Sequence, residues 1–134
     1  EDLHCGMAIF SLRQLTADLR QASSGLVGQE AILAIADAYR NFARTHPGIY
    51  PLTIRAPGPE ETELAALAQE LLQMLLLVMA SLGLRGNDAF HAIRGLRAIL
   101  HGFTSLEAAG GYKMPLDQEE SFHRLVNTYL DGLT

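Results

Sequence analysis

The stretch LHGFTSLEAAGGY, residues 100–112, shows which kind of fold the chain adopts. Its apolar residues recur at helical spacing, and the pair Gly110-Gly111 is a helix stop signal. The same period extends back to residue 88, with Asn87 as the expected N-cap. Gly102 interrupts this regularity, because a glycine inside a helix costs about 1 kcal/mol relative to alanine.

On a helical wheel, the apolar residues of 88–109 fill one broad arc. Gly95 and Gly102, seven residues apart, fall together along one edge of that arc. The pair predicts the close approach of another helix, either from within the chain or from a second copy. A polar stripe beside the arc is either a solvated face or the wall of a cavity or interface. The stripe consists of Arg94, Arg97, His101, Thr104 and Ser105.

The rest of the sequence follows the helical period as well, and it shows no strand-like alternation of useful length. We expect further helices at 2–23, 29–46, 60–83 and 118–133, and one or two helical turns at 49–54. Asp117 is the expected N-cap of the last helix, and Glu120 completes a capping box with it. The sequence therefore predicts an all-α fold, a helical bundle of about five main helices in one domain that spans residues 1–134.

Composition and charge argue against several functions. The 134 residues carry a net charge of −5, and the nine Arg and one Lys form no basic cluster. We therefore do not expect this chain to bind nucleic acid by itself. The longest apolar run, residues 74–80, is too short to span a membrane. The single cysteine, Cys5, excludes an internal disulfide and fits a reducing, cytoplasmic environment.

Motifs for catalysis or metal binding are weak. The sequence has no glycine-rich phosphate loop, no nucleophile elbow and no acid pair at catalytic spacing. Glu120 and His123 match the Glu-x-x-His spacing of di-iron bundles, but such sites need a second copy of the motif and two further Glu. We therefore expect no catalytic residue, no metal site and no cofactor, and we do not expect an enzyme.

Several large or adaptable side chains favour an apolar cavity in the bundle. Tyrosine combines an apolar ring with a polar end, and methionine fills irregular space. The alternative is that the same residues simply fill the core. These residues are Tyr39, Phe42, Tyr50, Met74 and Met79.

The segment YRNFARTHPGIYPL, residues 39–52, resembles the Tyr…Phe…His-Pro-Gly-Leu-Tyr segment in the regulatory domains of tetracycline-repressor (TetR) family transcription factors. The stretch at 100–112, followed by PLDQEESFHRLVNTYLDGL at 115–133, resembles the last two helices of one subgroup. That subgroup carries a Trp-His-Gly motif. Here Leu100 stands at the Trp position, whereas His101 and Gly102 match. The resemblance covers nearly the whole chain.

This resemblance implies a ligand-sensing, homodimeric regulatory domain without its N-terminal three-helix DNA-binding domain. A start at Glu1, without a methionine, agrees with a fragment. Ligands in this family typically enter a cavity among the first four helices of the domain, and the last two helices of each subunit form a four-helix interface. A small, mostly apolar effector would then control DNA contact by the missing domain. The alternatives are a ligand-free dimerisation module and, less expected, a small helical-bundle enzyme.

Two sets of residues carry these expectations. The ligand-binding set is Phe10, Tyr39, Phe42, Tyr50, Met74, Val78, Arg97 and His101. The dimer-interface set is Gly95, Gly102, Phe103, Leu106, Phe122, Leu125, Val126 and Tyr129. The side chain of His101 has three possible surroundings, because it could face the cavity, the partner subunit or solvent.

Overall fold

A computed structural model describes residues 2–133, with side chains from residue 5 onward. Within these residues every regular element is helical and none is a strand, which confirms the predicted all-α bundle of five main helices. The elements are α1 (Asp2–Ser23), α2 (Gly28–Thr45), the 3₁₀ helix η1 (Tyr50–Thr53), α3 (Thr62–Ser81), α4 (Gly86–Ala108) and α5 (Gln118–Gly132).

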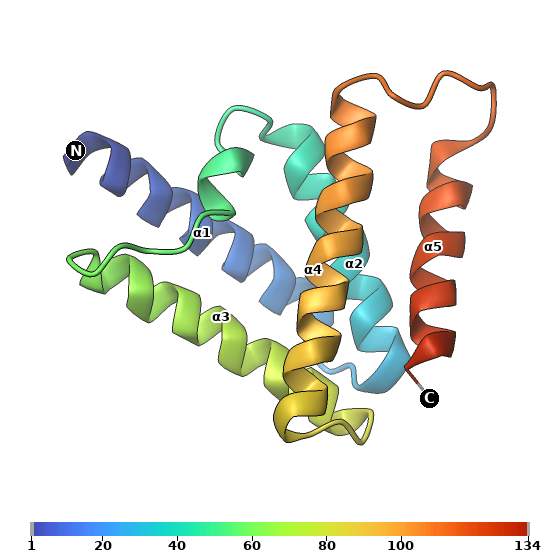
Figure 1. The fold of residues 1–134 in the computed structure, drawn as a ribbon, viewed down its shortest axis with the longest axis horizontal. Coiled ribbons are helices and arrows are strands. Elements are labelled where there is room, and N and C mark those ends of the chain that lie inside the picture. Colours follow the sequence, from blue (N-terminus) through green and yellow to red (C-terminus); the bar gives the residue numbers. More distant parts are fainter. Residues whose placement is uncertain (1, 134) are drawn as a thin grey trace.

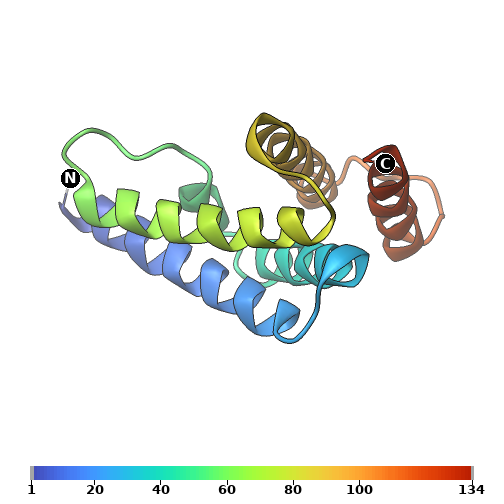
Figure 2. The ribbon, with the colours of Figure 1, turned by 90° about the horizontal axis from the view of Figure 1, so that it is seen from below.

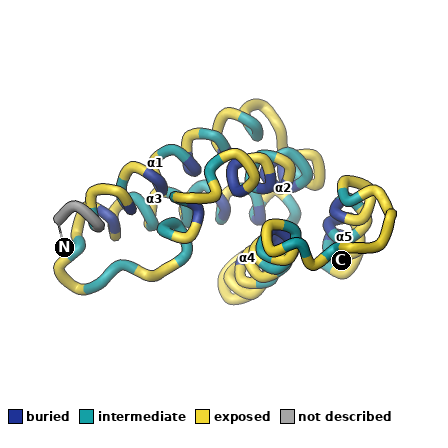
Figure 3. The backbone as a smooth tube through the Cα atoms, turned by 90° about the horizontal axis from the view of Figure 1, so that it is seen from above, coloured by how far each residue is buried: buried dark blue, intermediate teal, exposed yellow. Residues whose placement is uncertain are grey.

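The helices form two groups. α1 and α3 lie side by side and run in the same direction, as Figures 1 and 2 show. α4 crosses this pair steeply, α2 lies behind α4, and α5 stands antiparallel to α4 at the edge of the molecule (Figure 1). Figure 3 shows that one side of α4 is exposed along much of its length. α4 therefore has one face toward the bundle and one face toward solvent.

Apolar burial holds the helices together in two clusters. The main cluster is centred on side chains of α2, α3 and α5 that are fully enclosed, among them Ile32, Phe42, Met79 and Phe122. A smaller cluster of Ala8, Leu12 and Leu64 joins the N-terminal ends of α1 and α3. Burying each large side chain of this kind contributes about 1.5–3 kcal/mol. The buried apolar residues of α5 belong to the main cluster. Packing against the other helices therefore determines the position of α5.

The start of α5 confirms Asp117 as the predicted N-cap but does not show the predicted capping box with Glu120. Asp117 is the N-cap, and its carboxylate accepts a hydrogen bond from the backbone N–H of Glu119 at 3.2 Å. Glu120 forms an ion pair with Arg124 at 2.7 Å, one helical turn ahead. The predicted capping box is therefore replaced by a surface ion pair along the helix.

The start of α4 differs from the prediction, and Asn87 is not its N-cap. The helix begins at Gly86, two residues earlier than predicted, and Arg85 precedes it in an extended conformation. Gly86 has a φ of +59°, a value that side-chain-bearing residues rarely adopt. The turn geometry at this glycine therefore sets the helix start in place of a side-chain cap.

The two glycines of α4 have different surroundings. A Cβ atom at Gly95 would lie 3.3 Å from Cε1 of Tyr129, so this glycine allows α5 to approach within the chain. The Tyr129 hydroxyl donates to the carbonyl of Ala92, and burial raises the pKa of Tyr129 to about 12. A Cβ at Gly102 would meet no atom of the described chain within 4 Å. Close packing inside the chain therefore accounts for Gly95 and leaves Gly102 facing open space.

α3 is apolar enough to raise the question of a membrane span. An 18-residue window of this 20-residue helix has a mean hydropathy of 1.7, so by length and composition alone α3 could cross a bilayer. Only 22% of that window is buried, and the buried residues of α3 are Leu64, Leu75 and Met79. At the surface, two glutamates of α3 form ion pairs with arginines of α1: Glu63 pairs with Arg13, and Glu70 pairs with Arg20.

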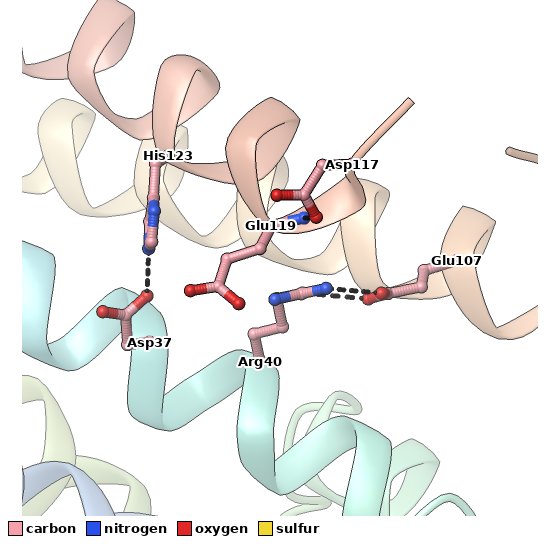
Figure 4. A network of polar contacts seen from close by, with 6 residues as sticks. All are labelled: Asp37, Arg40, Glu107, Asp117, Glu119 and His123. Carbon is pink, nitrogen blue, oxygen red and sulfur yellow. Dashed lines mark hydrogen bonds and ion pairs between the residues drawn. The ribbon is translucent and has the colours of Figure 1, made fainter. Parts of the chain in front are cut away.

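A buried ion pair joins α2 to the last turn of α4. Arg40 donates two hydrogen bonds to the Glu107 carboxylate, from Nε at 3.1 Å and from Nη2 at 2.7 Å (Figure 4). The Arg40 guanidinium also lies over the rings of Phe103 and Phe122, at 5.8 and 5.4 Å from their centroids. The hydrogen bonds to Glu107 raise the pKa of Arg40. Three helices therefore meet at one charged group, since Phe122 belongs to α5.

Breaking this pair should cost far more than breaking a surface pair. Glu107→Ala leaves Arg40 charged and buried, so we expect the free energy of unfolding to fall by about 3 kcal/mol. The control is Glu70→Ala, which breaks the half-exposed pair with Arg20 and should cost at most about 1 kcal/mol. Urea denaturation at one fixed protein concentration measures both losses. Equal losses would contradict a structural role for the Arg40–Glu107 pair.

Candidate functional site

Two adjoining cavities lie among α1, α3, α4 and the segment after η1. The first, which we call the α2-side cavity, has a volume of about 260 Å³ and reaches Ile35 and Tyr39 of α2. The second, the loop-side cavity, has a volume of about 390 Å³ and reaches Arg55 and Pro57. Both are partly open to solvent, and their sizes are close to the lower end of small-molecule sites. The wall that they share consists of Thr53, Ile54, Leu71, Leu75, Arg94 and Arg97.

The apolar walls come from leucines at helical spacing. Leu15 and Leu19 of α1 face the α2-side cavity, and Leu12, one turn earlier, faces the loop-side cavity. Leu71 and Leu75 of α3 lie one helical turn apart, so both point to the shared wall. The two helices that run in parallel thus both contribute leucines to the apolar surface of the cavities.

A chain of hydrogen bonds forms the polar end of the α2-side cavity. The hydroxyls of Tyr39 and Tyr50 are 2.5 Å apart, and the Tyr50 hydroxyl lies 2.8 Å from Nδ1 of His101. Thr104 donates to the same Tyr50 hydroxyl at 3.3 Å. Burial, followed by the hydrogen bond with Tyr50, raises the pKa of Tyr39 well above its usual range. The Tyr39 phenol therefore stays neutral near pH 7.

Glu61 anchors the loop that lines the loop-side cavity. Its carboxylate receives two hydrogen bonds from Arg55, both at 2.7 Å, and one from the backbone N–H of Gly58, also at 2.7 Å. These contacts, with Arg55 first, lower the pKa of Glu61 to about 2. The charge of Arg55 is thereby balanced within the loop.

Two further arginines of α4 lie in the shared wall without a carboxylate partner. Arg97 donates from Nη2 to the backbone carbonyl of Ile54 at 3.2 Å. Arg94 lies one turn earlier, and neither arginine forms an ion pair with any residue that the structure describes. The cavities are therefore mostly apolar, with neutral hydroxyls at one end and two unbalanced positive charges between them.

Residues 32–129 match the family model described as the tetracyclin repressor-like C-terminal domain. The chain belongs to this TetR-like family. The match covers more than half of the chain and includes η1, α3 and α4 together with most of α2 and α5. The resemblance found in the sequence to TetR-family regulatory domains is thereby confirmed.

Two curated relatives are named as uncharacterized HTH-type transcriptional regulators. One, from Mycobacterium tuberculosis, is 33% identical over 111 residues, which are 82% of this chain and 51% of that protein. The other, from Bacillus subtilis, is 30% identical over 128 residues, which are 95% of this chain and 66% of that protein. The chain thus spans between half and two thirds of the length of these relatives. Both names describe transcriptional regulators, and neither describes an enzyme.

A solved structure shares the fold. It is a protein of unknown function from Rhodococcus sp. RHA1, and it superposes with a TM-score of 0.83 over 98% of this chain and 73% of its own. Sequence identity is 23%, so this likeness concerns the helical arrangement alone.

Three of the eight expected ligand-binding residues of this TetR-like domain, Tyr39, Arg97 and His101, are in the wall of the α2-side cavity. Tyr50 lies just behind that wall and bonds to two of them. Phe42 lines neither cavity; it is fully buried in the core and its ring stacks on His46.

The three other expected ligand-binding residues lie outside the cavity walls. Phe10 lies on the surface of α1, where 59% of it is exposed. Met74 and Val78 pack, half-buried, against the main core instead of facing either cavity. Each is offset along α3 from Leu71 and Leu75, which do line the walls.

The expected interface residues divide in a similar way. Phe103, Phe122 and Val126 are buried in the chain's own core and expose little surface. Gly95 packs against Tyr129, as described above. The residues with surface remaining are Gly102, Leu106, Leu125 and Tyr129.

No group of three His, Cys, Asp or Glu side chains is close enough to hold a metal ion within the described part of the chain. Glu120 and His123, which have di-iron spacing, have other partners. Glu120 pairs with Arg124, and His123 lies 2.9 Å from Asp37 on α2 (Figure 4).

The Tyr50 hydroxyl should matter for stability because it lies between the Tyr39 hydroxyl and Nδ1 of His101 and contacts both. Tyr50→Phe leaves the Tyr39 hydroxyl and Nδ1 of His101 without this partner, and we expect a loss of about 1–2 kcal/mol in the free energy of unfolding. Tyr112→Phe is the matched control, since the Tyr112 ring packs on Phe103 at 4.8 Å but its hydroxyl has no protein hydrogen bond among the described residues. It should cost less than about 0.5 kcal/mol. Thermal unfolding compares the two variants.

Proposed function

We propose that this TetR-like regulatory domain binds a small, mostly apolar effector in the two adjoining cavities and thereby controls DNA binding in a homodimeric, cytoplasmic regulator. The observation that carries the proposal is the pair of cavities, which share a wall and leave space in an otherwise packed bundle. Protein interiors normally leave few voids larger than a water molecule. A filled dimerisation module would not need this space.

The DNA-binding part belongs to the rest of the parent protein in this proposal. The curated relatives are HTH-type regulators that are longer than this chain. A helix-turn-helix dimer reads two half-sites about 34 Å apart, so a small change in subunit geometry alters DNA affinity. The effector would act by binding one geometry better than the other, which shifts the population between them. α1 would carry the shift, since it lines both cavities and leads toward the N-terminus.

The outward faces of α4 and α5 would form the subunit contact. Gly102 faces open space on α4, and Leu106, one turn further along, is 52% exposed. A glycine beside an exposed apolar residue allows a second helix to approach closely. Together with the corresponding helices of a second copy, α4 and α5 would build a four-helix interface. Membership of the Trp-His-Gly subgroup also stays a proposal, which His101 and Gly102 support.

Filling the loop-side cavity should abolish effector binding. Ala68 lies in its wall, so Ala68→Phe would place a ring in the space that the ligand needs. The control is Ala65→Phe, on the exposed side of the same helix. A thermal-shift panel of apolar compounds, beginning with 1-decanol, should raise the unfolding midpoint of the unsubstituted protein and of A65F by several degrees. An equal rise in A68F, or no rise with any compound in any protein, would contradict the proposal.

Gly102→Leu should weaken dimerisation without destabilising the subunit. Leucine is a better helix former than glycine by roughly 1 kcal/mol, and the described chain leaves room for it. A side chain there would hold a second helix away, so we expect dimer affinity to fall at least tenfold. Gly6→Leu is the control, because Gly6 is a helical glycine on α1 with equally open surroundings. Sedimentation velocity over a concentration series measures the dimer, and unchanged affinity in G102L would refute this interface.

A further inference from the structure

We propose that the effector carries an anionic head group, a carboxylate or a phosphate, on an apolar body, and that Arg94 and Arg97 bind this head group. The inference rests on the effector-binding function proposed above and adds the chemical class of the ligand. It comes from the distribution of charge around the two cavities.

The walls of the cavities are basic although the chain is acidic. The sequence contains 15 acidic and 10 basic residues. Yet the charged residues that line the two cavities are Arg55, Arg94 and Arg97, and no Asp or Glu is among the lining residues of either cavity. Arg55 is balanced by the two hydrogen bonds to Glu61. The net charge presented to a bound ligand therefore comes from Arg94 and Arg97.

Arg94 and Arg97 are also placed to act together. They are three residues apart on α4, so their side chains leave the same face of the helix. Both belong to the wall that separates the α2-side cavity from the loop-side cavity. Both are exposed at the mouth of the cavities, which avoids the large desolvation penalty of a buried charge. A head group at this position would remain near solvent while its apolar body entered between the leucines of α1 and α3.

The hydrogen-bonding capacity of Arg97 is only partly used. A guanidinium has five N–H donors in a planar fork, and the contact with the Ile54 carbonyl at 3.2 Å occupies one of them. The remaining donors fit the paired oxygens of a carboxylate or phosphate, to which arginine binds in a bidentate manner. His101, one turn beyond Arg97, and the neutral Tyr39 hydroxyl add polar groups on the same side of the cavity. A cationic ligand would meet like charges here.

Arginines that lie outside the cavities and form no ion pair provide a control for Arg94 and Arg97. Arg13, Arg20, Arg40, Arg55 and Arg124 each pair with a glutamate. Arg44 and Arg85 have no ion pair among the described residues and are exposed like Arg94 and Arg97, but they line neither cavity. Replacing these two removes the same charge as replacing Arg94 and Arg97 without touching the site.

The test compares three ligands with one tail and different heads: decanoate, 1-decanol and decylammonium, each below its micelle concentration. Calorimetric titration is carried out on the unsubstituted protein, on R94Q/R97Q and on the control R44Q/R85Q. We expect decanoate to bind the unsubstituted protein and the control at least about tenfold more tightly than decanol, since charge-assisted hydrogen bonds are stronger than neutral ones. In R94Q/R97Q decanoate should fall to the affinity of decanol, whose own binding should not change.

Each other outcome overturns a defined part of the proposal. Equal binding of decanoate and decanol to the unsubstituted protein would refute head-group recognition and leave an apolar effector site in place. A preference for decanoate that persists in R94Q/R97Q would refute the assignment to these two arginines. A preference for decylammonium would mean that the site favours a positively charged head group, which contradicts the proposal. If neither these ligands nor the apolar panel binds, the proposed effector function itself fails.

Discussion

The buried pair of Arg40 and Glu107 is the constraint on which the arrangement of the helices depends. It joins α2 to the last turn of α4, and the rings of Phe103 and Phe122 cover it. A charged group in such surroundings has few alternative positions, because each one would leave it unpaired away from water. The pair therefore fixes the C-terminal end of α4 relative to α2, and through Phe122 it fixes the start of α5 as well.

Because this end of α4 is fixed, the directions in which the other faces of α4 point are fixed as well. The inward face adds Leu96 and Leu100 to the core, and the side next to it presents Arg97 and His101 to the cavities. The outward face carries Gly102 with no neighbour from the described chain. One helix thus borders the core, the ligand space and the proposed partner. This explains why its sequence mixes leucines, arginines and glycines more than a purely structural helix would.

The helices could be predicted from the sequence because their signals are local. The predicted spans agree with α1–α5 to within about two residues, which is the usual uncertainty of helix ends. The surroundings of single side chains could not be predicted in the same way. The wheel placed Gly95 and Gly102 on one edge, but only the packing of α5 decides that Tyr129 covers the first and not the second. Likewise, periodicity identified the apolar residues of α3 without showing that Leu71 and Leu75, and not Met74, border empty space.

The polar contacts along α4 differ in how easily a ligand could change them. At the C-terminal end, the buried pair with Arg40 involves two charge-assisted hydrogen bonds, which are expensive to break. At the middle of the helix, the contact from Arg97 to Ile54 is one hydrogen bond at an exposed position, where the net contribution is about 1 kcal/mol. A ligand with a differential affinity of a few kcal/mol is sufficient to replace the second contact and insufficient to break the first. Any movement that an effector causes should therefore begin in the N-terminal half of α4, beside α1 and α3, while the end that contacts α2 and α5 stays in place.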